Sequence, residues 1–282
     1  MSAIESAITD WFQSHARDLP WRSSNPWGVL VSEFMLQQTP VVRVTPKWHE
    51  WMERWPTPDA LAAASPADVI TAWGRLGYPR RALRLRECAI VISHEHNNRV
   101  PSDVATLLTL PGIGSYTAAA IASFAYQDRA LVLDVNIRRL FRRLYDGSDQ
   151  LSAAPTKSEI KERSQLLPET GAHIWAAATM ELGALICTAR SPKCDQCPVA
   201  NECHWRAAGY PASEVRKRGQ KWHGTDRQCR GTIIEALRSA PSLSQQEIEQ
   251  LWSEKEQLDR AIASLLKDQL ITVVETRYSL PQ

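Results

Sequence analysis

The sequence contains no long apolar run. In its 282 residues, no apolar stretch reaches the roughly 18 residues that a membrane-spanning helix needs, so we expect no membrane contact. The opening segment, residues 1–21, mixes acidic with apolar residues, which is typical of an amphipathic helix and not of a signal peptide. We therefore expect a cytoplasmic protein, associated with the nucleoid if the source is bacterial.

Cysteine is also scarce. The chain has six cysteines, of which Cys88 and Cys229 stand alone and the other four lie between residues 187 and 203. Secreted disulfide frameworks place an even set of cysteines throughout a small domain, and this distribution differs from that pattern. The cluster of four therefore requires another explanation.

Net charge is small, at +2, and residues 226–282 are acidic, with seven Lys or Arg against nine Asp or Glu. Two arginine runs stand out: residues 74–86 hold five arginines, and residues 136–144 hold four on one predicted helical face, opposite an apolar face. Such runs are commonly solvated helix faces. Together with the basic segment 215–221 they favour a polyanionic partner.

Strand-like alternation is absent until the end of the chain. Apolar residues recur with helical spacing from residue 2 to 186, which predicts an all-α body. A polar stretch follows, and helical patterns then cover about 227–239, 244–252 and 255–267. The final segment, "LITVVETRYSLP", predicts two short strands. Three helices followed by a hairpin is the order of a winged-helix module.

The four clustered cysteines, Cys187, Cys194, Cys197 and Cys203, are separated by six, two and five residues. Structural zinc usually takes two separated Cys-x-x-Cys pairs, whereas this loop has only one close pair. An iron–sulfur cluster is wider than a single ion, and its ligands tolerate irregular spacing. Zinc and free buried cysteines remain alternatives at this point. A metal would fold a loop that has few apolar residues of its own.

The segment "LPGIGSYTAAA" predicts a tight turn between two helices. Pro111 ends one helix, Gly112 and Gly114 permit positive φ, and Ser115 begins a helix rich in alanine. Backbone N–H groups at such a turn can bind a phosphate. An ordinary helix–turn–helix corner is the alternative.

Two carboxylates are candidates for acid–base chemistry. Glu33 has Val29 and Leu36 on its own helical face, so a carboxylic acid there would have a raised pKa and could act as a general acid. A surface glutamate is the alternative. Asp134 follows an apolar run and precedes a predicted helix, where a helix N-cap is its ordinary role.

The cysteine spacing and the string L-P-G-I-G resemble the iron–sulfur DNA glycosylases of the helix-hairpin-helix superfamily, which include endonuclease III and the adenine DNA glycosylases. The string S-E-x-M-L-Q-Q-T, at residues 32–39, is similar to the adenine DNA glycosylase signature. The resemblance covers about residues 1–210. It implies a mostly α fold, with a six-helix barrel domain and an iron–sulfur cluster domain, followed here by the small winged-helix-like module. It also implies a [4Fe–4S] cluster on the four cysteines.

The resemblance, together with the change of sequence pattern after residue 210, suggests four segments. Residues 1–23 and 138–210 would form the iron–sulfur cluster domain, and residues 24–137 the six-helix barrel domain with the hairpin. Residues 211–225 would be a linker, and residues 226–282 the winged-helix-like module.

The resemblance also assigns roles. Glu33 would protonate the adenine leaving group, and Asp134 would stabilise the oxocarbenium-like sugar, as paired carboxylates do in glycoside hydrolysis. Tyr116 occupies the position at which bifunctional members carry a Schiff-base lysine, so we expect the DNA strand to stay intact. The base must flip out of the duplex to be reached. The remaining expected site residues are Asn136 within the catalytic site, Trp21 and Arg22 lining the adenine pocket, Gln37, Gln38 and Thr39 at the opposite purine, Tyr78 as an aromatic wedge, and Gly112, Gly114 and Ser115 on the DNA backbone.

The sequence departs from the family pattern in three places. Ala177 stands where Glu or Gln often reads the base, Val135 replaces a small residue, and 57 residues replace a longer Nudix-like domain. We expect a monomeric, monofunctional DNA glycosylase acting on double-stranded DNA, at adenine paired with 8-oxoguanine or guanine, with a reduced preference for 8-oxoguanine. The alternatives are a thymine or uracil glycosylase on G·T mismatches and an iron–sulfur winged-helix regulator. Endonuclease III-type strand cleavage is disfavoured by Tyr116 and Glu33.

Overall fold

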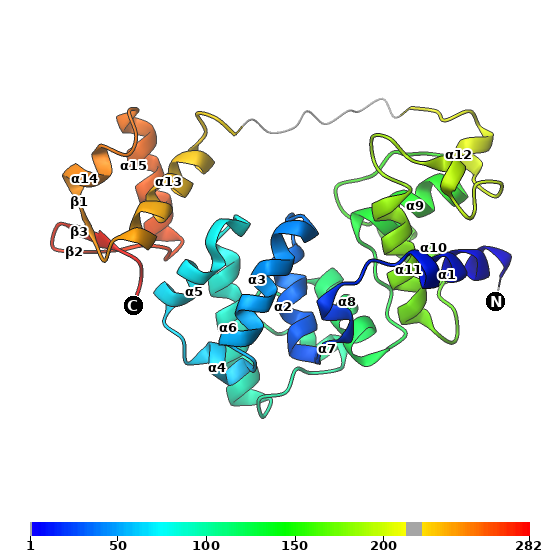
Figure 1. Ribbon diagram of the computed structural model, residues 1–282, viewed down its shortest axis with the longest axis horizontal. Helices are drawn as coiled ribbons and strands as arrows, with labels where there is room; N and C mark the ends of the chain where they lie inside the picture. Colours follow the sequence, from blue (N-terminus) through cyan, green and yellow to red (C-terminus); the bar gives the residue numbers. More distant parts are fainter. Residues whose placement is uncertain (1, 213–221) are drawn as a thin grey trace. The chain divides into compact units, whose positions relative to one another are not determined.

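The computed structural model describes residues 2–212 and 222–282, and their elements are shown in Figure 1. The described residues form two compact units. Residues 2–30, 102–109 and 113–212 form one, which we call the cysteine unit because it contains Cys187–Cys203. Residues 31–101, 110–112 and 222–282 form the other, which we call the Glu33 unit. The basic segment 215–221 lies outside the described residues.

The cysteine unit is entirely helical in its described part. Helix α11 packs against α1, α8 and α9, while α7 packs on α8 and α12 on α9. The elements of this unit are α1 (Ala3–His15), η1 (Pro20–Ser23), α7 (Val104–Leu107), α8 (Ser115–Tyr126), α9 (Val135–Asp146), α10 (Lys157–Ser164), α11 (Ala172–Leu185), η3 (Cys194–Gln196) and α12 (His204–Ala207). Helix α2 (Pro26–Leu36) begins in this unit and continues into the other.

Helix ends in the cysteine unit follow ordinary capping chemistry. Ser2 and Glu5 form a capping box at the start of α1. The hydroxyl of Thr156 accepts a hydrogen bond from the Glu159 N–H at the start of α10. Gly147 ends α9 in the left-handed conformation, with φ of 65°. These caps satisfy backbone groups that would otherwise lack partners.

The Glu33 unit begins as a helical body built around tryptophan. The ring centres of Trp51 and Trp55 lie 4.8 Å apart, and those of Trp51 and Trp73 lie 5.4 Å apart. Both pairs are edge-to-face, an arrangement that aromatic rings prefer. Helix α6 packs on α4 and α5. After α2, the elements of this body are α3 (Val41–Arg54), α4 (Pro58–Ala62), α5 (Pro66–Trp73), η2 (Gly74–Leu76) and α6 (Arg80–Glu95).

The C-terminal module, residues 222–282, belongs to the same unit. It contains α13 (Asp226–Ser239), β1 (Leu243–Ser244), α14 (Gln245–Glu249), α15 (Lys255–Lys267), β2 (Thr272–Val274) and β3 (Arg277–Ser279). The strands form an antiparallel sheet of order β1-β3-β2, in which Tyr278 pairs with both Leu243 and Val273. The winged-helix order is as expected, but the helix predicted over 244–252 is shorter, and β1 is an additional strand.

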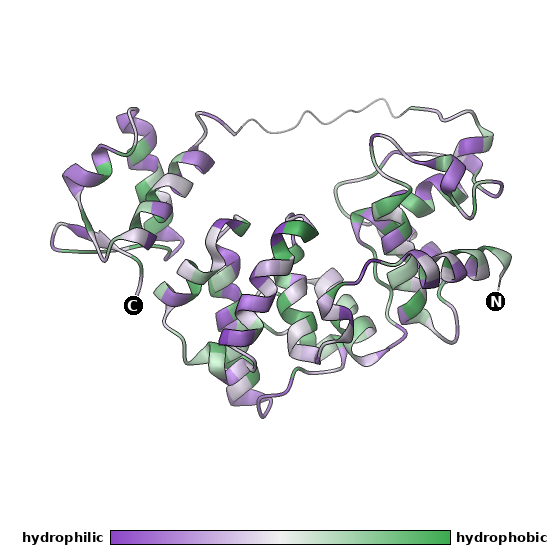
Figure 2. Ribbon diagram, viewed as in Figure 1, coloured by the Kyte–Doolittle hydropathy of each residue, from purple (hydrophilic) through white to green (hydrophobic). Residues whose placement is uncertain are grey.

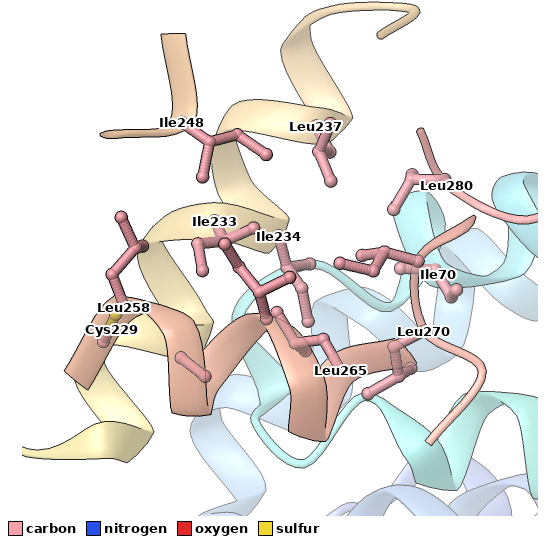
Figure 3. Packing of buried hydrophobic residues seen from close by; sticks show 13 residues of the cluster. Ile70, Cys229, Ile233, Ile234, Leu237, Ile248, Leu258, Leu265, Leu270 and Leu280 are labelled. Atoms are coloured by element: carbon pink, nitrogen blue, oxygen red, sulfur yellow. The ribbon is translucent and has the colours of Figure 1, made fainter. Parts of the chain in front are cut away.

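The module has its own apolar core (Figure 3). Its helices carry hydrophobic residues on one part of their surface and hydrophilic residues on another (Figure 2). Cys229, Ile233, Leu258 and Leu265 are fully enclosed, and Ile70 of α5 belongs to the same cluster. The module is therefore packed onto α5 through this shared core.

Among the described residues, no helix combines the length and apolar character needed to cross a membrane. The mostly helical fold confirms the expected fold class. The division into four segments remains a prediction.

Candidate active site and cysteine loop

Glu33 lies in a helix that is buried on all sides. Its side chain is 5% exposed, and the residues from Trp27 to Met35 are all buried. The alternative of a surface glutamate is therefore wrong. A buried carboxyl group next to apolar side chains is the environment in which a glutamate acts as a general acid.

The three residues predicted to meet the opposite purine differ in their exposure. Gln37 is half-buried, and Gln38 is exposed and adopts a left-handed backbone conformation with φ of 54°. Thr39 is buried, and its hydroxyl donates a hydrogen bond to the Leu76 carbonyl at 3.1 Å. Gln38 is thus the residue that the segment presents outward, while Thr39 joins it to the next loop.

The loop that carries Tyr78 is also strained. Gly77 has φ of 85° and Tyr78 has φ of 48°, and the Tyr78 side chain is 42% exposed. Left-handed conformations cost energy for residues other than glycine and persist only where the surroundings enforce them. The indole N–H of Trp73 donates a hydrogen bond to the Gly77 carbonyl at 2.9 Å, which holds the turn.

Arg81 connects these two loops. Its Nη1 donates hydrogen bonds to the Phe34, Met35 and Gln37 carbonyls, at the C-terminal end of α2. Its Nη2 donates to the Thr39 hydroxyl, at 3.1 Å, and to the carbonyls of Leu76 and Gly77.

Burial lowers the pKa of Arg81 to about 10, so the guanidinium remains charged at neutral pH. The sequence does not single out Arg81, because it is one of five arginines in 74–86 and nothing in that run distinguishes it. Its neighbours in the run also have partners within the protein: Arg75, Arg80 and Arg84 pair with carboxylates, and Arg86 donates to the Ala64 carbonyl.

The glycine turn has the expected backbone. Gly112 has φ of 80°, and a Cβ atom there would lie 2.9 Å from the Phe34 ring and 3.1 Å from Arg84 Cβ, so both conformation and packing require glycine. Gly114 and Ser115 are exposed at the start of α8, and no side chain in the described residues caps that helix. Its first N–H groups are suited to binding a phosphate.

Tyr116 is half-buried at the second residue of α8. A phenol at this position provides no amine for a Schiff base.

Asp134 is the N-cap of α9. One carboxylate oxygen accepts a hydrogen bond from the Ile137 N–H at 2.7 Å, and the other accepts one from Asn136 Nδ2 at 2.6 Å. Burial raises the pKa of Asp134 and outweighs these hydrogen bonds and the charge of Arg139, which lower it. The capping role predicted as the ordinary alternative is therefore present. These hydrogen bonds hold the Asp134 carboxylate in place, and helix capping is compatible with a second role of this carboxylate toward a substrate.

Val135 causes no local distortion, because it is the first residue of α9 and is 58% exposed. A β-branched residue is tolerated at this exposed helical position.

The turn around Asn136 depends on two residues that the sequence analysis missed. A Cβ atom on Gly183, in α11, would lie 2.6 Å from the Asn136 carbonyl oxygen, so only glycine allows α11 to approach so closely. Arg139 Nη2 donates to Asn136 Oδ1 at 2.8 Å and to the Gly183 carbonyl at 2.6 Å. The sequence shows a glycine at 183 within a helical segment, but only the packing shows that the close approach of α11 to Asn136 requires it.

The arginine run of α9 corrects a prediction. Arg138, Arg139 and Arg143 are 5%, 7% and 2% exposed, so they form neither a solvated face nor a patch for a polyanion. Arg138 pairs with Glu159, and Arg139 donates to the Cys187 carbonyl at 2.7 Å. Helical periodicity placed these arginines on one face but could not show that this face is covered by other parts of the unit.

Trp21 and Arg22, predicted to line the adenine pocket, lie in η1. Trp21 is 7% exposed. Arg22 Nη2 pairs with Glu181 of α11 at 2.9 Å, and Arg17 binds the same carboxylate at 2.7 Å. Glu181 is 2% exposed, and its pKa is lowered because the hydrogen bonds and charges of Arg17 and Arg22 outweigh the effect of burial. The guanidinium of Arg22, itself partly exposed, is thus held by an ion pair with a buried carboxylate.

The cysteine loop surrounds one cavity. Its lining includes all four predicted ligands, together with Arg143 and Trp205; the ligands are Cys187, Cys194, Cys197 and Cys203. Burial raises the pKa of the Cys197 thiol to about 11, so binding a metal requires this proton to leave. In the described part of the chain, no three His, Cys, Asp or Glu side chains are grouped closely enough for a single metal ion.

Arg143 suits a sulfur-containing group in this cavity. Its Nη1 donates to the Cys187 sulfur at 3.4 Å and to the Thr188 carbonyl at 2.7 Å, and its guanidinium lies 4.3 Å from the centre of the Trp205 ring. Its Nε is buried with no acceptor in the described residues. Four thiols and a buried, unsatisfied N–H on one cavity fit an anionic iron–sulfur cluster.

Comparison with known proteins agrees with this geometry. Residues 31–169 match the HhH-GPD superfamily of base excision DNA repair proteins, and residues 187–203 match the iron–sulfur binding domain of endonuclease III. The structure is similar to that of a thermostable thymine-DNA glycosylase, with a TM-score of 0.67, 26% identity, and coverage of 72% of this chain and 95% of that one. The fold and the cysteine loop define an HhH-GPD superfamily protein with a [4Fe–4S] cluster held by the four cysteines.

Two similar proteins of known name show to which family within this superfamily the chain belongs. The chain is 50% identical over 275 residues to the adenine DNA glycosylase of Mycolicibacterium smegmatis, covering 96% of this chain and 93% of the relative. It is 37% identical over 217 residues to the adenine DNA glycosylase of Homo sapiens, covering 73% of this chain and 40% of the relative. The chain belongs to the adenine DNA glycosylase family. The first match extends over nearly the whole chain, so the short C-terminal module has a counterpart in that relative.

Proposed function

We propose that this protein removes adenine paired with 8-oxoguanine or guanine in double-stranded DNA, as a monomeric and monofunctional glycosylase of base excision repair. The observation that carries the proposal is the buried carboxyl group of Glu33 within the segment Ser32–Thr39, in a chain that is 50% identical to an adenine DNA glycosylase. A buried acid is needed because adenine is a poor leaving group until it is protonated.

The reaction begins with base flipping. Gln38 and Tyr78 are exposed at the tips of two loops that Arg81 joins, which suits residues that enter the base stack. The exposed N-terminus of α8 binds a phosphate of the DNA backbone near the flipped base. Opening the stack costs a few kcal/mol, and the inserted side chains offset part of that cost.

Bond cleavage then follows from two carboxyl groups. Glu33 gives its proton to a ring nitrogen of adenine, the N-glycosidic bond breaks, and its electron pair leaves with the base. The carboxylate of Asp134, fixed by Asn136 and the Ile137 N–H, stabilises the positive charge that develops on the sugar. Water adds to the sugar carbon and gives its proton to the Glu33 carboxylate. When bound, the [4Fe–4S] cluster gives the cysteine loop its shape.

Tyr116 and Ala177 refine the expected specificity. Without an amine at residue 116 the strand stays intact until alkali or a second enzyme cleaves it. Ala177, half-buried in α11, cannot hydrogen-bond to the base edge, so discrimination for adenine depends on the proton from Glu33.

Single-turnover assays test this proposal. The substrates are four duplexes with A or T opposite 8-oxoguanine or G, each analysed with and without alkali. We expect adenine release opposite both purines, faster opposite 8-oxoguanine, with strand breaks only after alkali. Thymine release opposite G would favour a mismatch thymine glycosylase. Strand breaks without alkali would contradict the monofunctional reaction expected from Tyr116. DNA binding without release of any base would favour a DNA-binding regulator.

A further inference from the structure

The C-terminal module is fixed to the helical body of the Glu33 unit. Beyond the shared core at Ile70, Arg238 Nε donates to the Ile70 carbonyl at 3.2 Å. Two ion pairs join the surfaces around this contact: Arg75 with Glu235 at 3.3 Å, and Arg80 with Asp268 at 3.1 Å. An apolar centre with polar pairs at its edge is the ordinary anatomy of a specific interface.

One edge of this interface reaches Tyr78. The guanidinium of Arg227, in the first turn of α13, lies 4.6 Å from the centre of the Tyr78 ring and 5.3 Å from that of Trp222. Arg81 lies 5.7 Å from the centre of the same Tyr78 ring. The ring of Tyr78 is thus contacted by the half-buried Arg81, from the helix that follows it, and by the exposed Arg227 of the module.

Arg227 differs from the other arginines of the module. Arg230, Arg238, Arg260 and Arg277 each pair with a carboxylate at 2.6–3.8 Å. Arg227 is exposed, and no carboxylate among the described residues pairs with it. An exposed, unneutralised guanidinium between two aromatic rings, in a module whose net charge is negative, has the chemistry of a contact to an anion.

We propose that Arg227 positions Tyr78 for insertion into the duplex and binds a DNA phosphate beside it, so that the C-terminal module forms part of the DNA-binding surface. The inference rests on the proposed function, because it takes Tyr78 to be the wedge. The ring contact restricts Tyr78, which already has a strained backbone, and the free N–H groups of Arg227 remain available for a phosphate.

The test compares Arg227→Gln with Arg277→Gln, a matched loss of one exposed arginine from the same module. The ligand is a duplex with 2′-fluoro-deoxyadenosine, which resists cleavage, opposite 8-oxoguanine. Dissociation constants are measured over a range of salt concentrations. We expect Arg227→Gln to weaken binding about tenfold and to reduce the slope of log K against log salt by about 0.9, the amount for one phosphate contact. Arg277→Gln should leave both unchanged.

Two further variants separate positioning from charge. Arg227→Lys should restore the salt slope but not the full affinity, because an ammonium replaces the charge without the planar stacking. In Tyr78→Leu, the additional Arg227→Gln change should cost clearly less than in the parent, because the ring contact is already lost.

The inference is overturned if Arg227→Gln binds DNA with the parent slope and affinity, or if it lowers only the melting temperature, as a purely structural contact would. The parent enzyme distinguishes the two proposals. If it fails to release adenine from the cleavable duplex, the proposed function is wrong. If it releases adenine and Arg227→Gln binds as the parent does, only the role of Arg227 is wrong.

Discussion

Arginines that donate to backbone carbonyls hold irregular loops in both units, but the two regions differ in what else supports them. In the Glu33 unit, Arg81 satisfies carbonyls from the end of α2 and from the loop before Tyr78. In the cysteine unit, Arg139 and Arg143 satisfy carbonyls of the cysteine loop, at Cys187 and Thr188. Both Arg81 and Arg143 have a buried Nε with no acceptor among the described residues, but only Arg143 also lines the cavity of the four cysteines, which would hold the iron–sulfur cluster.

The difference shows two ways of fixing a loop that has little apolar surface. In the proposed function the loops of Gln38 and Tyr78 insert into DNA. Arg81 holds the backbones of both loops, and the side chains of Gln38 and Tyr78 are exposed. The cysteine loop spans 187–203 and contains a short 3-10 turn, η3, as its only regular element in the structure. It needs both the arginines and the cluster.

Loss of the cluster should have the largest effect. We expect Cys197→Ser to lose iron and to cost more than about 4 kcal/mol of stability, because loss of a metal site is among the most damaging single changes. Iron content, the visible absorption of the cluster and thermal unfolding measure this. Cys88→Ser, at a buried cysteine outside the loop, is the control and should retain its iron. A Cys197→Ser variant with full iron and parental stability would contradict the account.

Removal of Arg81 should have the next largest effect. We expect Arg81→Leu to lower the free energy of unfolding by about 3 kcal/mol, because several carbonyls lose a charged donor. DNA binding should weaken more than stability alone explains, because both inserted loops lose their support. Arg84→Leu, in the same helix but exposed and paired with Glu87, should change stability by less than about 0.5 kcal/mol. Equal effects of the two changes on unfolding and DNA affinity would show that Arg81 has no special role.

Two glycine substitutions, one in each unit, test the close approach of α11 to Asn136. Gly183→Ala should cost about 1–3 kcal/mol and slow base release, because its Cβ would collide with the Asn136 backbone next to Asp134. Gly231→Ala is a matched change in α13, where the nearest atom to the new Cβ lies at 3.9 Å, and it should stabilise by about 0.5–1 kcal/mol. Unfolding curves and single-turnover rates for both variants provide the test. Stabilisation by Gly183→Ala would refute the close approach of α11 to Asn136.

The smallest expected effect concerns pH. Burial raises the pKa of Asp134 above 3.8, so its carboxylate becomes protonated, and inactive toward the sugar, at a higher pH than an ordinary aspartate. The rate of base release should therefore fall as pH decreases through a value above 3.8. Asn136→Ala removes a hydrogen bond that lowers this pKa, so its acid limb should move to higher pH. An acid limb that stays at the same pH in Asn136→Ala would show that Asp134 does not control it.

Much of the fold could be predicted because its signals are local. Helical periodicity, the glycine turn and the order of the C-terminal elements each depend on neighbouring residues. The role of the four cysteines within residues 187–203 as cluster ligands could be predicted, because the spacing of these ligands is a property of one loop. The functions of Arg81, Arg139 and Gly183 could not, because each depends on contacts between residues that are far apart in the sequence.

The arginine run of α9 shows the same limit. Periodicity placed Arg138, Arg139 and Arg143 on one face but gave no information about what covers it, and all three are buried. DNA binding follows from the family and from the exposed loops, while these arginines serve the interior of the protein.

In the proposed mechanism Glu33 supplies the proton for adenine release. The most direct measurement is the single-turnover rate of Glu33→Gln on a duplex with adenine opposite 8-oxoguanine, together with its affinity for the same DNA. We predict a loss of at least about 10³-fold in rate with DNA affinity and melting temperature near those of the parent, since glutamine has the same shape but no acidic proton. A Glu33→Gln enzyme that releases adenine at the parental rate would contradict the account.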